Sequence, residues 1–371
     1  MNEPLVEALE RFLEREVRPH VRSLEAQDSW PAAIVEKMAA MGLFGCTIAE
    51  QHGGLGLSAH AYAQLVERIS EVWMSLAGII NSHLIMASLV GRAGTEEQRR
   101  KWLPRFATGE LRGGLALTEP DCGTDLRAIR TSARRDGDAY VIDGTKTWIS
   151  NGIHGHVVAL LAKTAPGELS CFICEKGPGF SASRKLEKLG YKGIDSAELV
   201  FAGYRVPAAN LVGGVEGRGL QQVLAGLELG RINVAARAVG LANASLKESL
   251  AYAQVRKTFG KPICEHQAIA LKLADMATRV AAARLLVERA AQAYDSGARC
   301  DLEAGMAKLY ASEAALENAT EAMRIHGAYG YSKEFNIERY YRDAPLLCIG
   351  EGTNELQRII IARQLVARNR V

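Results

Sequence analysis

The feature that most constrains the fold is a double change of hydrophobic periodicity along the 371-residue chain. From Leu5 to about Leu111, apolar side chains recur at the three- and four-residue spacing of amphipathic helices. From about Arg112 to Gly213 the chain consists of short runs rich in Val, Ile, Phe and Thr, broken by Asp-Gly and Asn-Gly pairs typical of hairpin turns. Helical spacing returns after the glycine cluster that ends at Gly219.

This order predicts an α+β protein that is mostly α, because helices and strands are segregated and do not alternate as βαβ units. We expect an N-terminal helical domain (1–112), a middle antiparallel β domain (113–213) and a C-terminal helical bundle (214–371). A chain of 371 residues also exceeds the size at which one hydrophobic core usually stops growing, so several packed units are expected.

Composition excludes some classes of protein. Lys and Arg number 45 against 42 Asp and Glu, a net charge of +3 without a long basic block, so no nucleic-acid partner is expected. No run approaches the ~20 apolar residues that cross a bilayer. The longest candidates lie around Val157 to Ala162, so no membrane span is expected. Seven cysteines make no disulfide framework and the N-terminus is acidic, which favours a cytoplasmic location.

Several short motifs that are typical of other chemistries are weak matches in this chain. The glycines beginning at Gly54 resemble a dinucleotide fingerprint but follow a polar stretch, which predicts a loop before a helix. Cys171 and Cys174 would point to opposite faces of a strand. His154 and His156 have no third ligand nearby in sequence, so we expect no metal site.

Five segments carry residues suited to binding or catalysis. The run TEPDCGTD (118–125) predicts a turn whose amides and hydroxyls could hold a polar ligand, and TWISNG (147–152) places an aromatic ring and a hydroxyl on one strand face. The others are 256–267, 324–331 and 349–355. Taken singly, each has a structural explanation, such as a capped loop, a tryptophan buried in a β core or an arginine in a surface ion pair.

In this order, and within this helix–strand–helix plan, the five segments resemble the flavin-dependent acyl-CoA dehydrogenases over essentially the whole chain. The resemblance implies an FAD enzyme that oxidises an acyl-CoA thioester to the trans-2-enoyl thioester. It implies an electron-transfer flavoprotein as the electron acceptor. It also implies a homotetramer or homodimer, because several FAD contacts in the family come from a neighbouring subunit.

The resemblance assigns FAD contacts residue by residue. Thr118 would hydrogen-bond the flavin ring, Trp148 would cover one of its faces, and Ser150 would lie near its reactive nitrogen. Arg256 would meet the pyrophosphate, since a guanidinium fork can donate two parallel hydrogen bonds. The full set of expected FAD contacts is Leu115, Leu117, Thr118, Thr124, Trp148, Ile149, Ser150, Arg256, Thr258, Phe259, His266, Gln267, Arg324, Gly327, Ala328, Thr353 and Glu355.

Glu351 is the expected catalytic base. A carboxylate can remove the α-proton of a thioester while the flavin accepts the β-hydrogen as hydride, and exclusion of water raises the pKa of such a carboxylate toward the operating pH. The competing explanation is that Glu351 and Glu355 are first-turn acids of a helix that begins near Thr353. Some family members place the base immediately before Arg231, where this chain has Gly230, so Glu351 is the one candidate.

The expected substrate contacts are Thr124, Glu228, Arg231 and Gly352. Two departures from the family bear on the substrate. Gly350 stands where a Tyr often walls the acyl pocket, which predicts room for a branched, bulky or longer acyl group. Arg324 stands where many members have Gln; we expect it to pair with the pyrophosphate, and its recognition of a dicarboxylic thioester is a minority hypothesis.

Three other functions stay open. The first is a same-fold flavin oxidase or monooxygenase, and the second a dehydrogenase acting on an acyl-carrier-protein thioester, which carries the same phosphopantetheine arm as coenzyme A. The third is a non-catalytic scaffold that retains the fold. The oxygen-using relatives generally lack the glutamate, so Glu351 argues against the first, and the intact flavin motifs argue against the third.

Overall fold

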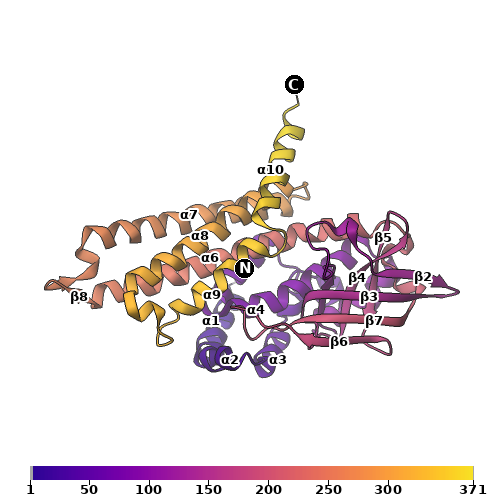
Figure 1. Ribbon diagram of the computed structural model, residues 1–371, viewed down its shortest axis with the longest axis horizontal. Helices are drawn as coiled ribbons and strands as arrows, with labels where there is room; N and C mark the ends of the chain where they lie inside the picture. Colours follow the sequence, from indigo (N-terminus) through magenta and orange to yellow (C-terminus); the bar gives the residue numbers. More distant parts are fainter. Residues whose placement is uncertain (1–2, 371) are drawn as a thin grey trace.

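The computed structural model describes residues 3–370, so the outermost residues of the first and third expected domains (1–2 and 371) lie outside the described part. Helices come first, a sheet follows and helices return, as the periodicity predicts (Figure 1). The α+β, mostly helical class is therefore confirmed. The domain boundaries at 112/113 and 213/214 stay predictions.

The N-terminal part is helical. Its α-helices are α1 (Glu3–Phe12), α2 (Val21–Gln27), α3 (Ala32–Ala40), α4 (Ala59–Ala93) and α5 (Glu96–Ala107). Thr95 and Gln98 start α5 with reciprocal side-chain-to-backbone hydrogen bonds, which satisfy two amides that the first helical turn leaves free. The polar stretch before α4 is a short 3-10 helix (Glu50–His52) followed by a loop, as predicted for the glycines that begin at Gly54.

Helix α4 is the longest strongly apolar helix of the described chain. Its most apolar window has a mean hydropathy of 1.5, and by length and composition alone it could cross a membrane. The expectation that the residues around Val157 to Ala162 are the longest apolar candidates was therefore wrong. However, 83% of that window is buried inside the protein, as in the core helix of a globular fold.

The middle part is a sheet, seven-stranded within residues 3–370. Its strands are β1 (Gly113–Ala116), β2 (Ser132–Asp136), β3 (Ala139–Ser150), β4 (Val157–Ala165), β5 (Glu168–Glu175), β6 (Phe180–Lys185) and β7 (Ser196–Pro207). Neighbours follow the order β1-β4-β2-β3-β7-β6, and β5 pairs with β4. The purely antiparallel prediction is corrected, because β4 runs parallel to both β1 and β2. Parallel neighbours need a long connection, and the β2–β3 hairpin with its loops lies between β1 and β4 in the chain, so β4 can run in the same direction as β1.

The two cysteines of β5 follow the two-residue alternation of a strand. Cys171 packs in a core cluster with Trp102, whereas Cys174 packs in the cluster with Tyr140 on the other face. Both thiols are buried, and burial raises their pKa. Among the described residues no group of three or more His, Cys, Asp or Glu could hold a metal ion.

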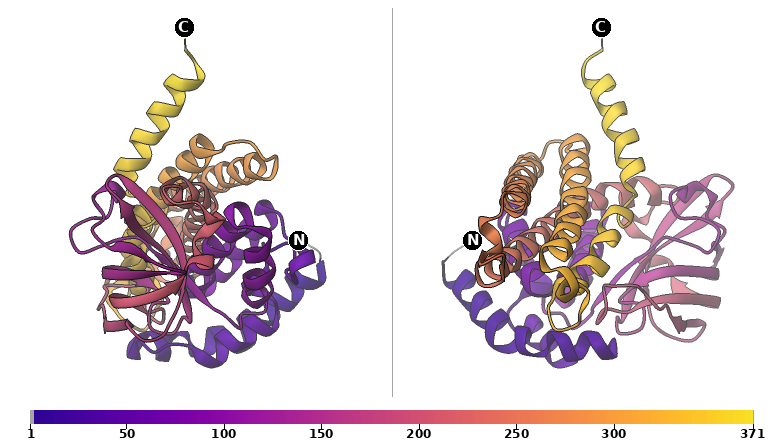
Figure 2. Two further views of the ribbon diagram at one scale, coloured as in Figure 1. Left: turned by 90° about the vertical axis from the view of Figure 1, so that its right-hand side faces the viewer. Right: turned by 60° about the vertical axis from the view of Figure 1, so that its left-hand side comes forward.

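The C-terminal part is a helical bundle. Its helices are α6 (Gly219–Val255), α7 (Gln267–Asp295), α8 (Asp301–His326), α9 (Ile337–Ile349) and α10 (Asn354–Arg368), and a hairpin of β8 (Lys257–Thr258) and β9 (Lys261–Pro262) joins α6 to α7. Helices α6, α7 and α8 lie side by side, and α10 projects away from the body and carries the C-terminus (Figure 2).

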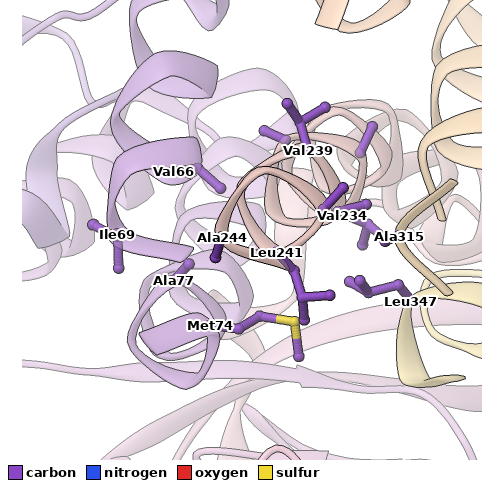
Figure 3. Close-up of a cluster of buried hydrophobic side chains, with 14 of the residues drawn as sticks. Val66, Ile69, Met74, Ala77, Val234, Val239, Leu241, Ala244, Ala315 and Leu347 are labelled. Atoms are coloured by element: carbon purple, nitrogen blue, oxygen red, sulfur yellow. The ribbon is translucent and has the colours of Figure 1, made fainter. Parts of the chain in front are cut away.

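The main core lies where α4 packs against α6. Gly240 approaches Glu67 so closely that a Cβ would lie 2.4 Å from its carbonyl oxygen, and Gly230 similarly adjoins Ile85, so the two helices run antiparallel. Apolar side chains from α4, α6, α8 and α9 close the core (Figure 3), among them Val66, Met74, Ala77, Val239, Leu241, Ala315 and Leu347. This helix pair supplies the walls of the site described next.

Candidate active site

Glu351 lies in the short loop between α9 and α10. Its backbone φ is +57°, in the left-handed region that residues other than glycine rarely adopt, and Gly352 follows at +88°. Thr353 caps α10 by accepting a hydrogen bond from the Leu356 amide at 3.3 Å, which confirms the predicted helix start. The side-chain amide of Gln357 donates to the carbonyl oxygens of Glu351 and Gly352 at 3.4 and 3.3 Å. The loop is thus a strained segment held by its surroundings, as is common at functional sites.

The Glu351 carboxylate points to the α4–α6 interface. Its Oε1 accepts a hydrogen bond from Asn81 Nδ2 at 3.1 Å, and a Cβ built on Gly230 would lie 2.9 Å from its Oε2. Position 230, where the resemblance places the base of some family members, therefore adjoins the Glu351 carboxylate. Burial raises the pKa of Glu351, although Arg237 and Arg231 oppose the shift. Glu355, by contrast, is exposed and resembles an ordinary first-turn acid.

Two of the expected substrate contacts are buried on α6 next to Gly230. Arg231 donates from Nη1 to Asp301 Oδ1 at 3.1 Å, at the start of α8. Glu228 lies 3.6 Å from the Cys300 Sγ, and burial, together with the nearby Asp301, raises its pKa. Their polar groups thus engage the start of α8, while Gly230 faces the Glu351 carboxylate.

A hollow of about 490 Å³ in the middle part gathers the first group of expected FAD contacts. Thr118 and Trp148 line it together with the turn 119–123, and the Thr147 amide donates to the Thr118 carbonyl oxygen at 2.9 Å. Trp148 lies in a bulge of β3 with a φ of +59°, and the residue is 58% exposed. The alternative of a tryptophan buried in a β core is therefore excluded. An exposed indole beside a hollow with threonine hydroxyls fits a stacked flavin ring.

The neighbouring expected contacts occupy the strands and turn that border this hollow. Leu115 is on β1 and Leu117 directly follows it, while Ile149 and Ser150 end β3. Thr124 is exposed in the turn after β1. The bulge breaks the regular alternation of side chains between residues 146 and 149. The prediction that Trp148 and Ser150 share one strand face assumed a regular strand, and β3 is not regular at this point.

Thr353 and Glu355 lie at the start of α10, whereas the expected FAD contacts of the segments 256–267 and 324–328 lie at the opposite end of the bundle from the sheet, where Figure 1 shows β8. Arg256 caps the end of α6, Thr258 ends β8, and Phe259 lies in the turn of the β8–β9 hairpin, where it is 97% exposed. A ring nitrogen of His266 lies 3.1 Å from the Thr258 hydroxyl, and Gln267 begins α7.

Arg324, Gly327 and Ala328 are exposed where α8 ends, near this hairpin. Tyr252, one turn before the end of α6, stacks on His326 with ring centroids 4.2 Å apart. One chain therefore does not bring Trp148 and these residues together. Lys308, also on α8, adjoins the Glu351 loop. At a rise of 1.5 Å per residue, Arg324 lies about 24 Å farther along this helix. Arg324 is thus remote from the Glu351 of the same chain.

Sequence reasoning missed residues that surround Glu351. Lys308 is fully buried, and its Nζ donates to the Cys348 carbonyl at 3.1 Å and to Asn354 Oδ1 at 2.7 Å, on either side of the Glu351 loop. Burial lowers the pKa of Lys308 to about 8. Asn81, Tyr191 and Arg237 were also missed. The one signal for Arg237 was its lone charge in the otherwise uncharged run 232–246, which does not by itself say what the side chain faces.

Comparisons with known proteins cover nearly all of the chain. Models of the acyl-CoA dehydrogenase N-terminal, middle and C-terminal domains match residues 2–110, 114–204 and 217–366. The chain is 40% identical to an acyl-CoA dehydrogenase of Bacillus subtilis (96% of this chain, 95% of the relative). It is 41% identical to a (2S)-methylsuccinyl-CoA dehydrogenase of Cereibacter sphaeroides (96% of this chain, 68% of the relative). The structure of butyryl-CoA dehydrogenase from Megasphaera elsdenii matches with a TM-score of 0.95, at 33% identity and 99% of both chains.

The fold, the partly buried Glu351 carboxylate and these matches define a flavin-dependent oxidoreductase. The chain belongs to the acyl-CoA dehydrogenase family. It is accordingly an FAD-dependent enzyme that dehydrogenates an acyl-CoA.

Proposed function

We propose that this protein oxidises an acyl-CoA to the trans-2-enoyl-CoA, with Glu351 as the base that removes the α-proton. The observation that carries the proposal is the desolvated Glu351 carboxylate, oriented by Asn81 and pressed against Gly230. Bound FAD supplies the acceptor for the β-hydrogen, which leaves as hydride. The substrate thereby loses one proton and one hydride, and a carbon–carbon double bond forms.

Several residues of the chain prepare this step. Exclusion of water makes the Glu351 carboxylate a stronger base than it is in solution, and the amide of Asn81 fixes one of its oxygens. Lys308 ties both ends of the Glu351 loop to α8. Thr118 and Trp148 line the hollow proposed for the flavin ring, and Thr124, Glu228, Arg231 and Gly352 are proposed as substrate contacts.

A second copy of the chain is proposed to complete the FAD site. The support is that the hollow lined by Trp148 adjoins the sheet, whereas Arg256 and Arg324 belong to the β8 end of the bundle (Figure 1). Large apolar residues are exposed near that group, including Val255 at 80% and Leu271 at 59%, as expected of an association surface. Sedimentation equilibrium should give the mass of two or four chains. A monomer that retains FAD and activity would contradict the shared site.

The test of the proposed function is an anaerobic titration of the purified holoenzyme with acyl-CoAs of different length, branching and carboxylation. One class should bleach the oxidised flavin absorbance, and an electron-transfer flavoprotein, not oxygen, should then restore it. Rapid reoxidation by oxygen would favour the oxidase or monooxygenase alternative. Flavin that responds only to acyl-carrier-protein thioesters would favour the carrier-protein alternative, and a protein without FAD would favour a scaffold.

The cellular setting completes the proposal. We place the enzyme in lipid metabolism in the cytoplasm, and the finding that all seven cysteines are free supports a reducing compartment. The relatives named above act on different acyl groups, one a branched dicarboxylic thioester and one a butyryl thioester. The family alone therefore leaves the substrate class undecided.

A further inference from the structure

Arg237 is a buried cation that forms no direct salt bridge with a described carboxylate, and the Glu351 carboxylate interacts with its charge only at longer range. Its residue is 5% exposed, Nη1 donates to the Tyr191 hydroxyl at 2.9 Å, and Nε has no hydrogen-bond partner. None of the ion pairs among the described residues includes Arg237, whereas Arg231 on the same helix pairs with Asp301. Charges in protein interiors are normally paired, because leaving one unpaired is costly. An anion that is not part of the chain would satisfy this guanidinium.

Arg237 lies next to the Glu351 site. It follows Gly230 by seven residues on α6, which is two helical turns, so both positions share one face of the helix. Long side chains on a helix lean back toward its N-terminus, which brings the guanidinium toward Gly230 and the carboxylate beside it. In agreement, Arg237 is the charged group that most opposes the rise in the pKa of Glu351.

Tyr191 places its hydroxyl group next to the Arg237 guanidinium. Its backbone φ is +56°, and its amide donates to Asp343 Oδ1 at 2.6 Å. The hydroxyl reaches the α4–α6 interface only because residue 78 is glycine, since a Cβ there would lie 1.5 Å from the hydroxyl oxygen. The Arg237 Cζ also lies 5.6 Å from the centre of the Tyr191 ring. The strained backbone of Tyr191 and the absence of a side chain at Gly78 thus allow the Tyr191 hydroxyl to lie beside the Arg237 guanidinium.

We infer that the substrate is the mono-CoA thioester of a short dicarboxylic acid, whose free carboxylate is bound by Arg237 and the Tyr191 hydroxyl. The inference rests on the proposed function, because Glu351 marks the position of the α-carbon. The guanidinium supplies charged donors and the hydroxyl a further one, a set that matches the acceptors of a carboxylate. This assignment moves the dicarboxylate hypothesis from Arg324, which is remote within the chain, to Arg237.

The experiment measures flavin reduction by matched pairs of thioesters in the parent holoenzyme. Succinyl-, glutaryl- and adipoyl-CoA are compared with butyryl-, pentanoyl- and hexanoyl-CoA. We expect at least one diacid to exceed its length-matched partner in kcat/KM by more than about 10-fold, because a hydrogen bond to a charged group is worth that factor or more. Arg237→Gln should lower this ratio about 10- to 100-fold, and Arg237→Lys should lower it less.

The controls separate this inference from the proposed function. Arg284→Gln removes an arginine that pairs with Glu67 at 2.6 Å, away from the site, and should leave the ratio unchanged. Tyr191→Phe keeps the ring and should lower the ratio even if Arg237→Gln fails to fold. A parent that prefers monocarboxylic thioesters overturns the inference alone, as does a loss in Arg237→Gln that is equal for both classes. A flavin that no thioester reduces overturns the proposed function as well.

Discussion

Glu351→Gln is expected to keep FAD and to slow substrate-driven flavin reduction by about 10²- to 10⁴-fold, the usual contribution of a general base. The amide preserves the shape of the side chain and can still meet Asn81, but it cannot accept the α-proton. Stopped-flow absorbance under anaerobic conditions measures the effect. Glu317→Gln makes the same chemical change on the exposed side of α8, where Glu317 pairs with Arg279, and should reduce its flavin at the parent rate.

The pH dependence of the parent follows from the same carboxylate. Glu351 acts only when ionised, and burial raises its pKa. Flavin reduction should therefore slow as the pH falls through this raised pKa, earlier than an ordinary glutamate would allow. Glu317→Gln should show the same profile. A rate in Glu351→Gln close to the parent's would remove Glu351 from the mechanism.

The contact between Glu351 and Gly230 gives a sharper test of the base. In a Glu351→Gly background, Gly230→Glu should recover part of the lost rate, because the new side chain starts where the parent carboxylate ends. Ile85 must shift, since its Cδ1 would lie 2.7 Å from the new Cβ. If the double variant folds and binds FAD but its rate of flavin reduction does not rise, a carboxylate at position 230 does not reach the reacting carbon.

Lys146→Met is expected to lower the free energy of unfolding by about 3–5 kcal/mol, the usual cost of breaking a buried ion pair by removing one partner. The Lys146 side chain is fully buried and donates from Nζ to Glu119 Oε1 at 2.8 Å and to the Leu117 carbonyl at 2.9 Å. Glu119 also accepts from the backbone amides of Arg130 and Thr131 at 2.7 and 3.0 Å. Burial opposes ionisation of Glu119, but these donors outweigh it and hold its pKa below the usual value.

The same ion pair holds Thr118 beside Trp148, so Lys146→Met should also release FAD more readily. Urea unfolding gives the stability change, and gel filtration followed by flavin absorbance gives the FAD content. The control is Lys247→Met, which removes a lysine that is 62% exposed in a surface pair with Glu71 and should cost less than about 1 kcal/mol. Equal losses in the two variants would show that the Lys146 pair is not a structural anchor.

The order of helices and strands could be predicted because hydrophobic periodicity is a local property that each segment carries on its own. The start of α10 near Thr353 was predictable for the same reason, since a capping residue acts within one turn. Strand direction was not predictable in this way. β4 lies parallel to β1 through pairs such as Gly113 with Val157, and no local pattern encodes a partner 44 residues away.

The sequence by itself determined the fold class, the family and Glu351 as the one candidate base, because these rest on residue types and spacing along the chain. Only the tertiary structure decided what surrounds that base. Asn81 and Glu351 are 270 residues apart and yet share a hydrogen bond, and Tyr191 meets Arg237 from a different part of the fold. The burial that raises the pKa of Glu351 and the unpaired charge of Arg237 exist only once α4, α6 and the Tyr191 loop pack together. Desolvation depends on every neighbour in space, and most of those neighbours are distant in sequence.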